Sequence, residues 1–128
     1  METSITFTQA PIIIPPQNLS SREIGASLEF LGIVRELEKQ NALEGLNYEA
    51  YEPMARRILT RHLEELGSRH PCEQVLFIHR LGWVPVGEAS LFVRVLSSHR
   101  QEAFALLDEL ITRLKTDVPI WKSVCRDH

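Results

Sequence analysis

Apolar side chains recur at every second position from residue 26, which is the period of a β-strand with one buried face. Residues 46–50 indicate a second, short strand, and the charged and polar segment 36–44 between the two indicates a loop or a hairpin tip. The first run places these side chains on one face: Ala26, Leu28, Phe30, Gly32 and Val34. We therefore expect residues 26–34 and 46–50 to be strands.

From residue 53 the apolar period lengthens to that of a helix. Pro53 suits the first helical turn, where a missing N–H costs no hydrogen bond, and Gly67 suits a helix end. The predicted helix has one apolar stripe: Met54, Ile58, Leu59, Leu63 and Leu66.

Residues 74–81 and 89–96 are rich in branched and aromatic side chains and are predicted to be two strands. The short connection between them, residues 82–88, contains two glycines and a proline. Strands joined in this way are neighbours in a sheet, so we expect them to pair antiparallel.

A second helix is predicted to begin at Ser98, because Gln101 stands three residues later and the two match a capping box. Residues 117–119 should end this helix, since the residue before a proline resists helical backbone angles, and residues 120–121 should be extended. The expected core stripe is Ala103, Phe104, Leu107, Leu110, Ile111 and Leu114.

These elements predict an α+β fold, a two-layer sandwich in which two main helices cover a mostly antiparallel sheet. The chain has 128 residues, of which 44% are hydrophobic, and this length suits one domain with a single core. We expect one domain over residues 1–128, with a strand and a proline-rich lead-in over residues 1–24 and a short tail over residues 123–128.

Composition argues against several classes of protein. The formal net charge of −3 does not favour nucleic acid or acidic membranes, so any anion site must be local. The apolar residues 12–14 are bracketed by prolines and are too few for a signal core or a membrane span. Cys72 and Cys125 lack zinc-site spacing and are expected to be free thiols, which fits a cytoplasmic protein.

Lysine is rare, with three Lys against eleven Arg, and two of the three are Lys115 and Lys122. An amine can lose its proton in a suitable site, whereas a guanidinium cannot. A turn at Pro119 could bring Lys122 towards Lys115, and two adjacent ammonium groups lower each other's proton affinity, so one could act as a base or nucleophile. The alternatives are a helix-end cation for Lys115 and a flexible charged terminus anchored by Trp121 for Lys122.

His99 and Arg100 stand at the start of the second predicted helix, where free N–H groups and the helix dipole favour an anion. They could equally be solvated surface residues. The helix would be roughly 25 Å long, so Arg100 and Lys115 of one chain cannot easily contact one small ligand. A ligand that contacts both would require a site shared by two copies, which indicates a homodimer.

Arg35 ends the first strand, where binding groups often collect, and Gly32 allows close approach of a ligand or another backbone. His79, Arg80 and Glu88 indicate a structural hydrogen-bonding corner, with catalysis the minority interpretation. The chain lacks phosphate-loop, dinucleotide-loop and serine-nucleophile patterns, and the spacing of its histidines predicts no metal site. A metal enzyme or a nucleotide hydrolase is therefore not expected.

In sequence order, these residues resemble the large subunit of molybdopterin synthase. The matching positions lie between residues 25 and 122: 25–26, 30–35, 46–51, 54–55, 79–82, 87–88, 98–100, 103–104, 114–115 and 118–122. The resemblance implies the α/β hammerhead fold of that family. It also implies a part in molybdenum cofactor biosynthesis.

By this resemblance, the chain transfers sulfur to cyclic pyranopterin monophosphate from a small ubiquitin-like carrier subunit whose Gly-Gly C-terminus is thiocarboxylated. Lys115 and Lys122 match the catalytic lysines, no cofactor is implied, and a homodimer forms the core of a heterotetramer. His99 and Arg100 match residues that the neighbouring copy contributes. The implied substrate-binding residues are Ile33, Val34, Arg35, His99, Arg100, Lys115, Lys122, Ser123 and Val124.

Two other functions remain open from the residues alone. The chain could be a non-catalytic dimeric module that binds an anionic metabolite or docks a partner, or a small hydrolase, although no nucleophile for hydrolysis is evident. The family commonly carries a further arginine in a longer tail, and Arg126 is the nearest equivalent here.

Overall fold

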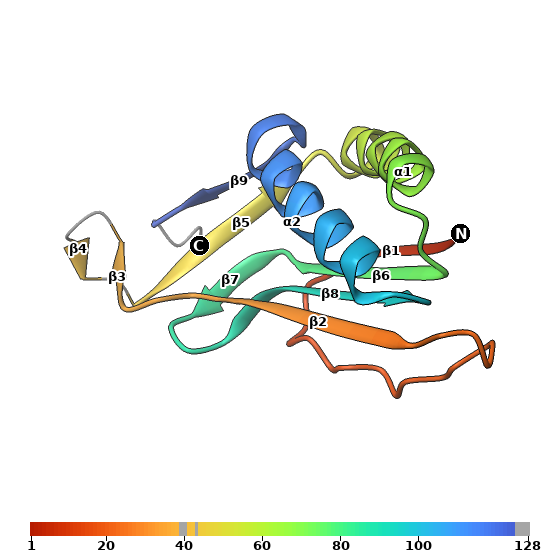
Figure 1. Cartoon of the computed structure of the whole chain (residues 1–128). Coiled ribbons are helices and arrows are strands. Elements are labelled where there is room, and N and C mark those ends of the chain that lie inside the picture. The colour runs from red at the N-terminus through yellow and green to blue at the C-terminus, as the bar shows by residue number, and fades with distance from the viewer. Residues whose placement is uncertain (39–40, 43, 125–128) are drawn as a thin grey trace.

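A four-stranded sheet with the strand order β1-β6-β8-β2 forms the centre of the computed structural model, which describes residues 1–38, 41–42 and 44–124. Strands β6, β8 and β2 pair antiparallel, as predicted for β6 and β8, whereas β1 pairs parallel to β6. Both helices cover one face of this sheet (Figure 1), as the predicted α+β sandwich requires. The four strands are β1 (Glu2–Thr8), β2 (Ala26–Ile33), β6 (Gln74–Arg80) and β8 (Ala89–Ser97).

The main core lies between the helices and the sheet face that they cover. Strand β2 has the predicted alternation, because Leu28 and Phe30 pack against this core while Ser27 and Glu29 are exposed. The side chains that fill the centre are Val75, Phe77, Leu91, Val93 and Val95 from the sheet and Leu59, Leu63, Leu106 and Leu110 from the helices.

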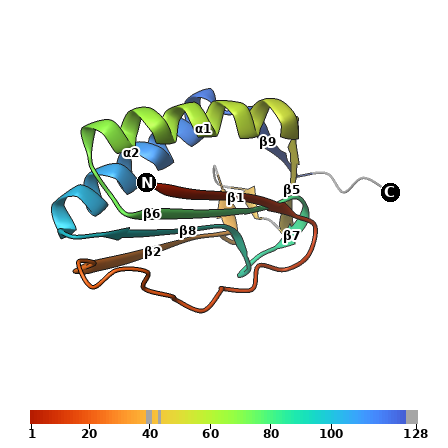
Figure 2. The same ribbon diagram turned by 90° about the vertical axis from the view of Figure 1, so that its right-hand side faces the viewer.

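The opposite face of the sheet is crossed by the segment between β1 and β2, residues 9–25 (Figure 2). Arg94, whose side chain is only 6% exposed, holds this segment. Its Nη2 donates to the Pro15 carbonyl at 2.7 Å, and its Nε donates to Glu29 at 2.7 Å. Ile78 and Phe92 are consequently buried on this face as well.

A smaller sheet with the order β7-β5-β9 continues from one end of the molecule. Its central strand is β5 (Gly45–Ala50), flanked by β7 (Gly82–Pro85) and β9 (Ile120–Ser123). Strand β7 lies within the connection that was predicted as a simple link between two strands. Gly82 has φ +83°, and this left-handed conformation lets the chain pass from one sheet to the other.

The predicted hairpin tip contains two short paired strands, β3 (Leu37–Glu38) and β4 (Asn41–Ala42).

Helix α1 (Glu52–Arg69) has Pro53 in its first turn, as predicted. Two details of the prediction are wrong. Gly67 does not end the helix; a Cβ there would lie 2.9 Å from the Met1 Cε, so glycine makes room for the N-terminal side chain. Met54 is 42% exposed instead of buried.

Helix α2 (Arg100–Asp117) ends before Pro119 as predicted, but the predicted capping box is wrong. His99 occupies the N-cap position without a side-chain cap, because the Ser98 hydroxyl donates to Glu73 at 3.2 Å instead. The buried stripe also differs from the predicted one. Phe104 is 58% exposed, and Leu106 is fully buried in its place.

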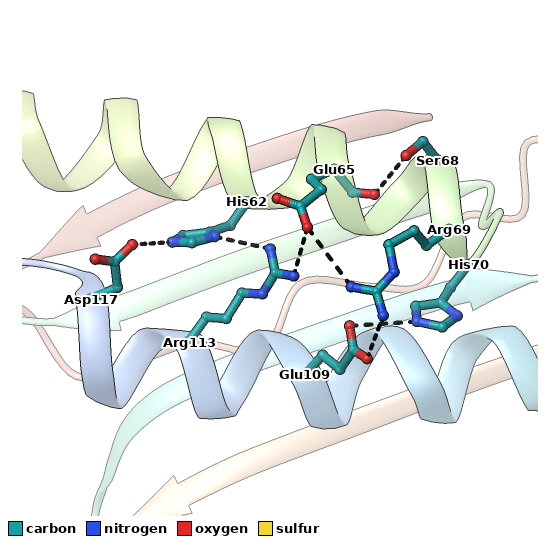
Figure 3. A network of polar contacts seen from close by, with 8 residues as sticks. All are labelled: His62, Glu65, Ser68, Arg69, His70, Glu109, Arg113 and Asp117. Carbon is teal, nitrogen blue, oxygen red and sulfur yellow. Dashed lines mark hydrogen bonds and ion pairs between the residues drawn. The ribbon is translucent and has the colours of Figure 1, made fainter.

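A polar network joins α1 to α2 along their exposed side (Figure 3). Arg113 donates to Glu65 at 2.8 Å and to the His62 Nδ1 at 3.1 Å. Because a guanidinium only donates, this Nδ1 accepts and the His62 Nε2 donates to Asp117 at 2.6 Å. The hydrogen bond from Arg113 holds the pKa of Glu65 below its usual value, and the network fixes the last turn of α2 against α1.

We predict that Arg94→Ala lowers the free energy of unfolding by about 3 kcal/mol, because it leaves the Glu29 carboxylate and the Pro15 carbonyl without this buried donor. Arg69→Ala is the matched control, since the Arg69 side chain is 50% exposed in its ion pairs and its loss should cost less than ~1 kcal/mol. Urea denaturation measures both values. Equal losses in the two variants would contradict the role given to Arg94.

We predict that Glu65→Gln makes stability less sensitive to acid. The pKa of Glu65 is lowered in the folded state, so its contribution is present above the unfolded value and is lost as pH falls through the folded value. Unfolding free energy measured from pH 7 to pH 3 should therefore fall less steeply in this variant. Arg113→Gln should flatten the curve in the same way, and additive effects in the double variant would refute the coupling.

Candidate functional site

An open pocket of about 710 Å³ lies where the end of β2, the small sheet and the last turns of α2 meet. A second, smaller pocket of about 330 Å³ lies between the N-terminus and α1. The larger pocket is lined by residues 30–35 and by Leu46, Tyr48, His79, Ser90, Leu91, Ile111, Leu114, Lys115, Ile120, Trp121 and Lys122.

One wall of this pocket is formed where β2 leaves the sheet. The pairing of β2 with β8 shifts register between Gly32 and Ile33, and such an irregularity bends the strand. Val34 is then fixed by two backbone hydrogen bonds, one to Glu88 at 3.0 Å and one from Gly87 at 2.9 Å. Arg35 follows at the exposed edge, so Ile33, Val34 and Arg35 all line the pocket, at the edge predicted from sequence.

The two lysines reach the pocket from different elements. Lys115 lies in the last turn of α2, and the chain then turns at Pro119 into β9, which pairs antiparallel with β5. This pairing places Lys122 directly opposite Tyr48. Lys115 and Lys122 therefore line the same pocket, in agreement with the fold-back predicted for this proline.

The floor of the pocket carries polar groups that sequence reasoning did not place in a site. The imidazole of His79 is 4% exposed, and the Tyr48 ring packs edge-on against it with 5.2 Å between ring centroids. Burial lowers the pKa of His79, so the ring is neutral near physiological pH. The Ser90 hydroxyl donates to the Gly32 carbonyl at 3.3 Å. No local pattern marks Tyr48 or Ser90, because only tertiary packing brings them here.

The predicted hydrogen-bonding corner is confirmed. Arg80 donates to Glu88 at 2.7 Å, and the His79 Nδ1 lies 2.8 Å from the Arg80 carbonyl. Successive side chains of a strand point to opposite faces, so His79 faces the pocket while Arg80 does not line it. In this corner, Arg80 and Glu88 have a structural role, and His79 faces the pocket.

His99 and Arg100 lie at the opposite end of α2 and do not line the pocket of their own chain. With 18 residues, α2 is about 27 Å long at 1.5 Å per residue. Both residues are exposed and accessible to another molecule. Within one chain, the structure therefore does not bring them together with the lysines.

The end of the described chain adds little to the pocket. Ser123 and Val124 follow Lys122 but do not line the pocket, and Val124 is 59% exposed. Arg126, considered above as the tail arginine, lies outside the described residues.

The charges of the pocket are of one sign. Arg35, Lys115 and Lys122 lie at its exposed rim, and the described residues that line it include no carboxylate. Phe30, Leu91 and other apolar side chains form most of the remaining wall. A positively charged rim, over an interior that is apolar apart from Tyr48, His79 and Ser90, suits an anionic ligand that also carries a flat or apolar part.

Within residues 1–38, 41–42 and 44–124, no three His, Cys, Asp or Glu side chains are grouped as metal ligands would be. Neither of the two described helices is long and apolar enough to cross a membrane.

The chain is similar to known proteins of one family. The family model described as MoaE protein matches residues 7–117. A molybdopterin synthase catalytic subunit from Bacillus subtilis is 37% identical over 106 residues, which are 83% of this chain and 68% of that protein. One from Oryza sativa subsp. indica is 40% identical over 103 residues, which are 80% of this chain and 53% of that protein.

A solved structure has the same fold. The crystal structure of molybdopterin synthase from Staphylococcus aureus superposes with a TM-score of 0.82 at 31% identity, over 94% of this chain and 90% of that one. The chain thus spans between about half and two thirds of the length of the two curated relatives above, and nearly all of the crystallised chain.

Proposed function

The chain belongs to the MoaE protein family, and we propose that it is the catalytic subunit of a molybdopterin synthase in molybdenum cofactor biosynthesis. Its substrate would be cyclic pyranopterin monophosphate. The observation that carries the proposal is that Lys115 and Lys122 line one pocket together with Arg35. The family match supports the proposed reaction, and the shared pocket supports a joint role for Lys115 and Lys122.

The positively charged residues of the pocket have separate roles in binding and in catalysis. The guanidinium of Arg35 is suited to the phosphate because its forked donors match the oxygens of an anion. Lys115 and Lys122 then donate or accept protons, or stabilise developing charge, while sulfur is transferred to the reacting carbon of the precursor. The sulfur comes from a thiocarboxylate on the partner, so no cysteine of this chain has to carry it.

We propose that the sulfur donor is a small ubiquitin-like carrier subunit with a thiocarboxylated Gly-Gly C-terminus. The pocket is open on one side, and Trp121 at its edge is 51% exposed. An extended, flexible tail can enter such an opening, whereas a folded domain cannot. Transfer in the cytoplasm is consistent with the free thiol of Cys72.

We further propose a homodimer as the core of a heterotetramer, in which His99 and Arg100 of one copy complete the pocket of the other. The length of α2 separates these residues from Lys115 of their own chain. Both are exposed at the helix N-terminus, where backbone N–H groups favour a phosphate. Ser123 and Val124, which follow Lys122 in the chain, would cover the same bound ligand.

We predict that Lys115→Ala lowers kcat by about 10²–10⁴-fold in a reaction with thiocarboxylated carrier and cyclic precursor, because a proton-transferring group is lost. Lys115→Arg should retain precursor binding but restore little turnover, since a guanidinium does not release its proton. Arg61→Ala, an exposed α1 residue outside the pocket, is the control and should keep wild-type turnover. Wild-type turnover in Lys115→Ala would refute the catalytic role of Lys115, whereas a wild-type chain that binds the precursor without converting it would be better described as a binding module.

We predict that inactive Lys115→Ala and inactive Arg100→Ala chains complement one another when they are co-expressed. If each site uses Lys115 of one copy and Arg100 of the other, a mixed dimer contains one intact site, so about a quarter of wild-type activity returns. Dithiolene product formation measures this. Activity no higher than the mean of the separate variants would show that each site belongs to a single chain.

A further inference from the structure

His79 occupies the pocket floor, although the proposed function gives it no part in binding. It lies near the end of β6, directly opposite Leu91 of β8 and Phe7 of β1. The rings of Tyr48 and Phe77 pack against it with centroid distances of 5.2 Å and 6.3 Å. The imidazole is therefore held in one orientation at a place that the substrate can reach.

The hydrogen bond at Nδ1 fixes which ring nitrogen carries the proton. Nδ1 lies 2.8 Å from the carbonyl oxygen of Arg80, and a carbonyl only accepts. Nδ1 of the neutral ring is thus the donor, and Nε2 is an unprotonated acceptor. The hydrogen bonds of the described residues include none to this Nε2.

We infer that the Nε2 of His79 accepts a hydrogen bond from an N–H or O–H group of the substrate and so determines which part of the substrate enters the pocket. This inference rests on the proposed function, because the pterin heterocycle carries several N–H groups. A neutral acceptor is electrostatically unfavourable next to phosphate oxygens, which are acceptors themselves.

The charges of the pocket support this orientation. Arg35, Lys115 and Lys122 lie at the exposed rim, and His79 lies on the floor among apolar side chains. A phosphate at the rim gains charge-assisted hydrogen bonds, whereas a phosphate at the floor would be desolvated opposite a lone pair. The heterocycle therefore faces His79, and the phosphate stays with the cations.

Two substitutions separate the acceptor from the structural hydrogen bond. His79→Asn keeps an amide N–H near the position of Nδ1, so the Arg80 carbonyl retains a donor while the acceptor is lost. His79→Gln places an amide oxygen near the position of Nε2. With cyclic pyranopterin monophosphate and thiocarboxylated carrier, His79→Asn should raise KM about tenfold with kcat unchanged, and His79→Gln should recover most of this loss.

Inorganic phosphate distinguishes substrate recognition from a general distortion of the pocket. Its inhibition constant should be the same in the wild type and in His79→Asn, because the inferred contact involves the heterocycle. A parallel increase in this constant, or an unchanged KM, would overturn the inference.

A measurement on the wild-type protein covers the case in which His79→Asn does not fold. In protein labelled with ¹⁵N-histidine, the Nε2 resonance of His79 should move towards the hydrogen-bonded position when the cyclic precursor is added. Inorganic phosphate alone should not move it, and an unmoved resonance with the precursor would overturn the inference.

Wild-type protein that neither binds nor converts the precursor would refute the proposed function as well. Normal turnover in the wild type together with unaffected His79 variants would refute only the role of His79.

Discussion

The pairing of β9 with β5 is the constraint on which the site depends. Helix α2 cannot continue through Pro119, and the extended residues that follow pair with β5 on the side that β7 does not occupy. Their pairing with β5 sets Lys122 opposite Tyr48, beside the last turn of α2 that carries Lys115. Two residues on separate elements thus acquire a fixed relation through backbone hydrogen bonds, without a direct bond between their side chains.

The elements with a strong local pattern could be predicted from the sequence. The alternation of β2, the antiparallel pair of β6 and β8, and the end of α2 before Pro119 all depend on neighbouring residues, and all agree with the structure. The capping box failed because the Ser98 hydroxyl has a tertiary partner in Glu73. Gly67 failed as a helix end because α1 continues to Arg69. For the capping box, a contact distant in sequence overrode the local preference.

The candidate site could be predicted only in part, for a related reason. The scarcity of lysine and the turn at Pro119 pointed to Lys115 and Lys122 as a pair, whereas only the family resemblance joined Arg35 to them; all three line one pocket in the structure. His79 was interpreted as part of a structural corner because it stands with Arg80 and Glu88 beside the connection between two strands, and the hydrogen bond from Arg80 to Glu88 confirms that corner. The strand period places alternate residues on opposite faces, and β7 and β5 then decide what lies above each face. That information comes from the topology and is absent from any short segment.

The parallel pairing of β1 with β6 has a consequence for how the chain is made. Its paired residues, such as Glu2 and Gln74, are 72 positions apart, and no shorter connection provides β1 with a partner in the central sheet. During synthesis the first strand therefore emerges from the ribosome long before its neighbour, and its edge stays unsatisfied until β6 has followed. The pairing of β1 with β6 is therefore a late event in folding.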